Sequence, residues 1–228
     1  MWWAVFAVTL LVIMPPVVVY LVRGVFMPEL FSVNEAAAIA EISPETIRTA
    51  LEKKSVAPAR RYRAGKAVRH QFSPGDVLYV KVLSEFPFAL SKHDKHSLAQ
   101  VLAQGSKKAS HWSLDGADLV YRSGNMQVVV QCKPLRQTVD QNVAAFRWGK
   151  QRIVSSPEVL EGEPVFRGTR IPLRHVASLF RKGISEQEIA EDFPSLGELD
   201  LAYARLASRF GEKPGRPRRR LRIKRKRT

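Results

Sequence analysis

Residues 30–51 carry apolar positions at helical spacing on both sides of a very short gap. Ser32 and Glu35 form a capping-box pattern, in which each side chain satisfies a free amide at the start of a helix. Ser43-Pro44 begins a second helix, because proline is well tolerated in the first helical turn. Only Glu41-Ile42 separates the two segments, so the sequence predicts two short helices joined by a tight turn.

Two short segments of strand-forming residues follow, 56–62 and 68–72. Between them lies the polar turn Arg63-Ala64-Gly65-Lys66, which predicts a β-hairpin. Ser73-Pro74 then begins a third helix with apolar residues through Leu83. Two helices, a hairpin and a further helix are typical of a winged helix-turn-helix domain, which we assign to residues 27–86.

Residues 87–148 mix helical and strand-like patterns. Helices are expected over 91–104 and 138–148, and strands over 111–114, 118–121 and 126–131, with glycine-containing turns between the strands. We expect this α+β connecting region to pack against the winged helix or against a second subunit.

Residues 149–211 carry three short helical segments after a hairpin-like lead. The first runs from Leu173 to Lys182 and is ended by Gly183. Two capping-box patterns then start the second and third helices, Ser185 with Glu188 and Ser195 with Glu198. These segments predict a compact trihelical domain, and the whole chain is expected to be mostly α with small β structure, in the α+β class.

The first 26 residues form a separate apolar segment. Trp2 to Val22 holds 21 residues without a charge, and a membrane-spanning helix needs about 20. No Lys or Arg precedes the run and no small-residue cleavage site follows it, which does not fit a signal peptide. Two interpretations stay open: an inner-membrane anchor with a cytoplasmic remainder, or a start codon assigned upstream of the true one at Met27.

Composition and charge narrow the class of partner. The chain is 45% hydrophobic and 25% charged, which excludes collagen-like and wholly disordered proteins. Its formal net charge is +16, and residues 212–228 hold ten cations and one Glu, a net of +9 that leaves +7 for the rest. This excess favours a polyanion, nucleic acid before an anionic membrane. A single cysteine excludes an internal disulfide framework, so we expect a cytoplasmic protein.

The basic residues of the expected winged helix are candidates for DNA contact. Asp and Glu are absent from residues 56–72, and the polar face of the second helix carries both hydroxyls and cations. The candidate DNA-binding residues are Thr46, Arg48, Thr49, Lys53, Arg60, Arg61, Arg63 and Lys66.

The strings SVNEAAAIAEISPETIR and HQFSPGDVLYVKVL, on either side of the basic hairpin, resemble the winged-helix domains of the MerR type. The resemblance covers about Leu30 to Glu85. It implies a DNA-binding protein whose second helix enters the major groove. The effector-sensing coiled coil of MerR proteins has no counterpart here.

The string IVSSPEVLEGEPVFRGTRIPLRHV, with GISEQEIAEDFPSL after it, closely resembles the domain of unknown function 433. The resemblance covers about Arg152 to Phe210. This domain is typical of VapB-type antitoxins paired with PIN-domain toxins, and a winged helix in front of it is the architecture of one antitoxin subgroup. The resemblance implies two partners, an operator DNA and a PIN-domain toxin, in a homodimer or a hetero-oligomer with the toxin.

The basic tail, residues 212–228, is expected to be disordered when free, because like charges repel and Gly and Pro break helices. Gly215-Arg216-Pro217 resembles the core of an AT-hook, which lies in the minor groove of A·T tracts. Alternatively, Arg216, Arg218 and Arg219 pair with the carboxylates of the toxin's active site. A nonspecific solubilising tail is the third interpretation.

Catalytic and metal-binding patterns are weak. His93 and His96 share a helix with Asp94 but lack a clear third metal ligand. Cys132, expected at the end of a strand, has Lys133 beside it, which would lower the pKa of its thiol. No phosphate-binding glycine loop is present in the sequence. Four acidic residues would form a site only if the fold gathered them: Glu158, Glu161, Glu163 and Asp192. We therefore expect no enzyme, no metal and no cofactor.

The sequence predicts a DNA-binding antitoxin that neutralises a PIN-domain ribonuclease and represses its own operon. The alternative is a membrane-tethered winged-helix transcription factor anchored by Trp2 to Val22. An adjacent reading frame with an acidic PIN-type active site would favour the first hypothesis. Co-sedimentation with membranes would favour the second.

Overall fold

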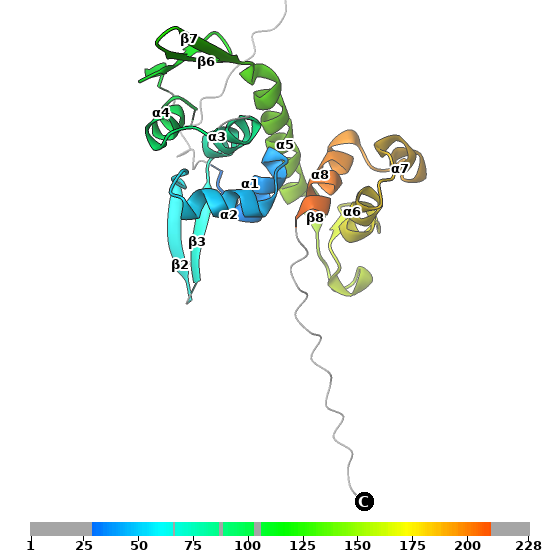
Figure 1. Cartoon of the computed structure of the whole chain (residues 1–228). Helices are drawn as coiled ribbons and strands as arrows, with labels where there is room; N and C mark the ends of the chain where they lie inside the picture. Colours follow the sequence, from blue (N-terminus) through cyan, green and yellow to red (C-terminus); the bar gives the residue numbers. More distant parts are fainter. Residues whose placement is uncertain (1–28, 66, 87–88, 103–105, 211–228) are drawn as a thin grey trace, which may run out of the picture.

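The computed structural model describes residues 29–65, 67–86, 89–102 and 106–210. In these residues, helices are combined with three small antiparallel sheets, which confirms the α+β class (Figure 1). Trp2 to Val22 and the basic tail lie outside the described residues. Among the described helices, none is both long and apolar enough to cross a membrane.

The first part of the chain begins with the two predicted helices. Ser32 caps the first by accepting from the Glu35 amide, while Glu35 accepts from the Ser32 amide in return, and Ser43 caps the second. The elements here are β1 (Phe31–Ser32), α1 (Val33–Ala40), α2 (Pro44–Glu52), β2 (Arg60–Ala64), β3 (Ala67–Phe72) and α3 (Pro74–Glu85). The strand expected over 56–62 begins only at Arg60, and Pro58, which has no amide hydrogen to donate to a ladder, lies just before it.

The middle of the chain forms one helix and a four-stranded sheet. They are α4 (Lys92–Leu102), β4 (Lys108–Ala109), β5 (Trp112–Asp115), β6 (Asp118–Ser123) and β7 (Met126–Val130), with strand order β4-β5-β6-β7. The helix and the three expected strands are confirmed with boundaries shifted by up to two residues. The short strand β4 was not predicted, since two residues carry no periodicity.

A 21-residue helix, α5 (Cys132–Arg152), connects the middle of the chain to the C-terminal part. The helix expected over 138–148 is therefore too short at both ends. Pro134 lies in the first turn of α5, where the missing amide breaks no helical hydrogen bond. The prediction that Cys132 ends a strand is wrong, because this residue begins α5.

The C-terminal part contains β8 (Ile153–Val154), a 3-10 turn η1 (Leu160–Gly162), β9 (Val165–Phe166), α6 (Leu173–Arg181), α7 (Glu186–Asp192) and α8 (Glu198–Arg209). The capping box of Ser185 and Glu188 at α7 is confirmed. The one predicted for α8 is wrong. Gly197 is the N-cap, and the Asp200 carboxylate accepts from its amide at 3.2 Å, so the helix begins two residues later than Ser195 implies.

The structure has two apolar cores, and α8 contributes side chains to both. The larger contains side chains of α1, α3, α4, the four-stranded sheet and one side of α5, and Leu206 of α8 reaches it. The smaller lies among α6, α7 and α8. Where α5 crosses α8, a Cβ on Gly149 would overlap the Tyr203 ring, so this crossing needs glycine. In Figure 1, α5 runs from the four-stranded sheet to the C-terminal helices, with α1 and α3 on one side and α8 on the other.

Candidate nucleic-acid interface

Helix α2 exposes one polar face beside the hairpin. Ile47 and Ala50 are buried against the core, which turns the opposite face of the helix to solvent. Of the candidate residues, Thr46, Arg48 and Lys53 are exposed and Thr49 is half-buried. The Arg48 guanidinium is paired with Glu45 at 2.9 Å, so part of its charge is compensated.

The hairpin β2–β3 projects away from the helices as a two-stranded ribbon (Figure 1). Every residue of β2 is exposed, which means that neither face of this strand is covered. Gly65 turns the chain with a φ of +62°, a conformation that suits a two-residue hairpin turn. Arg60, Arg61 and Arg63 are all exposed, while Lys66 lies outside the described residues.

The two faces of the ribbon carry different cations. Side chains alternate along a strand, and the register pairs Arg61 with His70 and Arg63 with Val68 on one face. That face borders a groove of about 390 Å³ lined by Leu51, Glu52, Lys54, Val56, Pro58, Arg61 and His70. Arg61 therefore lies across a groove from the C-terminal end of α2.

The other face of the ribbon carries Arg60, Tyr62 and Arg69. The Arg60 guanidinium lies 5.6 Å from the centre of the Tyr62 ring, a cation–π arrangement. Both faces are thus positive, and the sequence from Lys53 to Gly75 contains no carboxylate to offset them.

The base of the ribbon is fixed to the core at two places. Phe72 at the end of β3 is fully buried and pairs with Phe31 of β1. The Tyr79 hydroxyl of α3 donates to the Ser55 carbonyl at 2.5 Å, and burial raises the pKa of this phenol to about 12. Because Ser55 lies in the segment between α2 and β2, this bond attaches that segment to α3.

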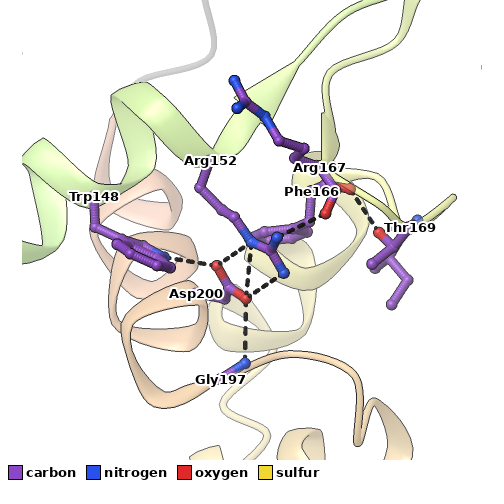
Figure 2. A network of polar contacts seen from close by, with 8 residues as sticks. Trp148, Arg152, Phe166, Arg167, Thr169, Gly197 and Asp200 are labelled. Atoms are coloured by element: carbon purple, nitrogen blue, oxygen red, sulfur yellow. Dashed lines mark hydrogen bonds and ion pairs between the residues drawn. The ribbon is translucent and has the colours of Figure 1, made fainter.

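The C-terminal domain has a buried ion pair that sequence reasoning missed (Figure 2). The Asp200 carboxylate accepts from Arg152 Nε at 3.0 Å, from Trp148 Nε1 at 2.8 Å and from the Gly197 amide at 3.2 Å. Arg152 Nη1 also donates to the Arg167 carbonyl at 2.7 Å. The network joins the end of α5 to α8 and to the strand β9, and all its members are satisfied within the fold.

The pKa of Asp200 reflects two opposing effects. Burial alone would raise it, but the hydrogen bonds from Arg152, Trp148 and Gly197 outweigh burial, so the pKa of Asp200 lies below its ordinary range. The carboxylate is thus held in its charged form. The one local signal in the sequence was Asp200, three residues after Gly197, and it gave no indication of Arg152.

The other candidate sites are not assembled by the fold. Asp94 is buried and binds Ser91 and His111, while His93 bonds to Ser110 and His96 to Gln100. No group of three or more His, Cys, Asp or Glu in the described residues is placed to hold a metal ion.

Cys132 and the acidic candidate Glu163 have structural contacts within the fold. Cys132 is buried, and burial raises the pKa of its thiol, so the lowering expected from Lys133 is wrong. Glu163 pairs with Arg174 at 3.1 Å. The tail candidates Arg216, Arg218 and Arg219 lie outside the described residues.

Comparison with known proteins bears on the C-terminal part. Residues 153–205 match the family described as "Protein of unknown function (DUF433)". The uncharacterized protein y4eO of Sinorhizobium fredii (strain NBRC 101917 / NGR234) is 34% identical over 95 residues, which is 41% of this chain and 42% of the relative. The chain thus matches less than half the length of that curated relative. Residues 153–205, with the ion pair of Asp200 at their junction with α5, therefore form a DUF433 domain.

Proposed function

We propose that this chain is a DNA-binding antitoxin. Its N-terminal part is a winged helix-turn-helix domain of MerR type, which binds operator DNA through α2 and the β2–β3 ribbon. Its DUF433 domain and basic tail bind and inhibit a PIN-type ribonuclease. The protein represses the operon that encodes the pair.

One observation supports DNA binding above all. The ribbon exposes Arg60, Arg61, Arg63 and Arg69 on two uncovered faces, in a stretch of sequence without a carboxylate. A ribbon whose only task was to cover the core would bury one face. Clustered, uncompensated cations are the electrostatic footprint of a phosphate-binding surface.

Helix α2 suits the base-reading part of the interface. Its exposed face carries Thr46 and Arg48 near the helix start, and the major groove is wide enough to admit an α-helix. The salt bridge from Arg48 to Glu45 holds this guanidinium locally and can be exchanged for a phosphate or a base edge.

The DUF433 domain is better suited to a protein partner than to DNA. Helix α8 packs on α5 on one side and on α6 on the other, so it is not free to enter a groove. Near its start, Leu199 is 43% exposed, and Trp148 of α5, whose indole donates to Asp200, is 40% exposed. Exposed apolar and aromatic side chains of this kind serve as anchors in protein interfaces.

Mobility shifts on the region upstream of the gene test the DNA-binding proposal. The triple variant Arg48→Ala, Lys53→Ala, Arg61→Ala should weaken binding about a hundredfold and lower the salt slope by about 0.9 for each phosphate that is no longer neutralised. The matched control is Arg136→Ala, Arg170→Ala, Lys182→Ala, which removes three cations elsewhere on the molecule. Equal binding by the two variants would contradict the proposed interface.

A second function, a membrane-tethered transcription factor, is favoured by the 21 uncharged residues from Trp2 to Val22. This alternative keeps DNA binding through α2 and the ribbon, but it replaces the toxin with a membrane as the second partner. A native product that needs detergent for extraction would support it. A product that stays in the supernatant after membrane sedimentation would contradict it.

A further inference from the structure

Strand β7 forms one edge of the four-stranded sheet. The strand order β4-β5-β6-β7 places β6 on one side of it, and no strand of the described residues pairs with its other side. In Figure 1, β7 lies at the border of the molecule, beyond β6. Three of its side chains are exposed: Gln127, Met126 at 51% and Val129 at 53%.

This edge lacks the features that usually keep an edge strand from pairing. Its sequence is Met-Gln-Val-Val-Val, without charge, proline or glycine, and its register with β6 is continuous over five residues, without a bulge. Natural edge strands generally carry a lysine, a proline or a bulge that blocks association. An edge free of all three is suited to accept another strand.

The hairpin geometry shows which backbone groups are available. Ser123 and Met126 are the closing pair of a two-residue turn, in which Gly124 has a φ of +56°. Hydrogen-bonded and non-hydrogen-bonded pairs alternate along an antiparallel ladder, and the closing pair is hydrogen-bonded. It follows that Gln127 and Val129 direct their N–H and C=O groups away from β6, toward the open edge.

We propose that β7 pairs antiparallel with β7 of a second copy of this chain, about a two-fold axis at Val128. This register sets Gln127 of each copy opposite Val129 of the other, so both outward residues of both strands exchange their hydrogen bonds. Val128 faces its own counterpart, and Met126 faces Val130. The two sheets become one continuous eight-stranded sheet.

A second copy fits this edge better than other occupants. The strand is uncharged and self-complementary in this register, so no like charges meet across the axis. Nucleic acid is a poor fit, because β7 carries no cation. The proposed dimer does not depend on the proposed DNA binding. If both hold, the two-fold axis gives the dimer two copies of α2 that can contact one duplex.

The oligomeric state of the full chain tests the proposal. Sedimentation velocity at micromolar concentration should show a dimer, and Val129→Lys should weaken it by about tenfold or more, because it sets a charge beside the axis in each copy. The control is Ile184→Lys, an exposed apolar-to-lysine change in the C-terminal part that should leave the dimer intact. A monomeric wild-type chain would overturn the proposal, and so would a Val129→Lys dimer as stable as the control. If β7 instead pairs with a strand of another protein, the wild-type chain alone should be monomeric.

Cross-linking tests the register without relying on a disruptive change. Two cysteines facing each other in a non-hydrogen-bonded pair have Cα atoms about 4.5 Å apart, within the range of a disulfide. Val128→Cys should therefore give a disulfide-linked dimer under mild oxidation, while Val129→Cys, which faces Gln127 of the other copy, should cross-link much less. Equal cross-linking of the two, or none by Val128→Cys, would rule out this axis.

Discussion

Asp200 is the carboxylate that holds the end of α5 against the DUF433 helices. Its side chain is 3% exposed and that of Arg152 is 25% exposed, so water screens this pair on one side only. Removing one partner of a buried ion pair costs more than the pair itself contributes, because the other partner is left without compensation. The junction is therefore sensitive to single substitutions.

Asp200→Asn should lower the free energy of unfolding by about 2 to 3 kcal/mol, because the amide leaves Arg152 without its counter-charge. Urea denaturation at neutral pH measures this loss. Asp140→Asn, an exposed change on α5, is the matched control and should have little effect. A loss no larger than that of the control would mean that the ion pair is not stabilising.

The same pair makes a prediction about pH. The pKa of Asp200 is lowered in the folded state, so its stabilisation is fully present above the unfolded pKa of about 3.9 and is lost as pH falls through the folded value. The stability difference between wild type and Asp200→Asn should therefore shrink as the pH is lowered below about 4. Urea titrations at several acidic pH values check this, and a difference that stays constant would contradict it.

Gly149→Ala should destabilise the protein by about 1 to 3 kcal/mol, since the added methyl would overlap the Tyr203 ring at the crossing of α5 and α8. Thermal unfolding measures the loss. Tyr203→Leu in the Gly149→Ala background gives the methyl group room, so the double variant should lose less than the sum of the single changes. Strict additivity would show that this contact does not set the crossing.

The helix starts that a serine caps were predicted correctly, whereas the capping box predicted for α8 was wrong. Ser32, Ser73 and Ser185 each accept from the amide three residues on, a signal that is local in sequence. At α8 the N-cap is Gly197, and Ser195 and Glu198 form only an apparent capping box. The carboxylate that caps this helix, Asp200, is also drawn to Arg152, 48 residues away, and no local pattern contains that arginine.

The β2–β3 ribbon makes a prediction that separates its two faces. Arg61→Ala with Arg63→Ala, on the face beside the α2 groove, should weaken operator binding more than Arg60→Ala with Arg69→Ala on the opposite face. Both double variants remove two positive charges, so each serves as the control for the other. Mobility shifts at two salt concentrations compare them. Equal losses would mean that the ribbon acts only through its total charge.

The long helix α5 connects the two parts of the molecule, and its buried apolar side chains lie in the larger core. Because α5 contacts α1, α3 and α8, the proposed DNA-binding part and the DUF433 domain are connected by packing as well as by the chain. Arg147 and Lys150 of the same helix pair with Glu29 at 2.6 and 3.5 Å, which attaches the first described residues to it.

Neutralisation is proposed to use the DUF433 domain for docking and the tail for inhibition. Deleting residues 211–228 should leave a complex with the PIN-type toxin that still forms but inhibits RNA cleavage less. The physical reason is that the deletion removes the tail's arginines, and a guanidinium pairs two carboxylate oxygens of an acidic active site. RNA cleavage assays with the intact and truncated proteins measure the difference. Equal inhibition would favour the minor-groove interpretation of Gly215-Arg216-Pro217.

The sequence by itself determined the α+β class, the capped helices, the hairpin turn at Gly65 and the DUF433 segment, because each depends on residues close together in the chain. Only the tertiary structure decided the full length of α5, the pairing of Arg152 with Asp200, the close crossing at Gly149 and the open edge of β7. Each of these depends on which segments meet in space. The apolar pattern alone did not show the full length of α5, because its buried side includes Asn142 and Gly149 and its last four residues, Gly-Lys-Gln-Arg, carry no large apolar side chain.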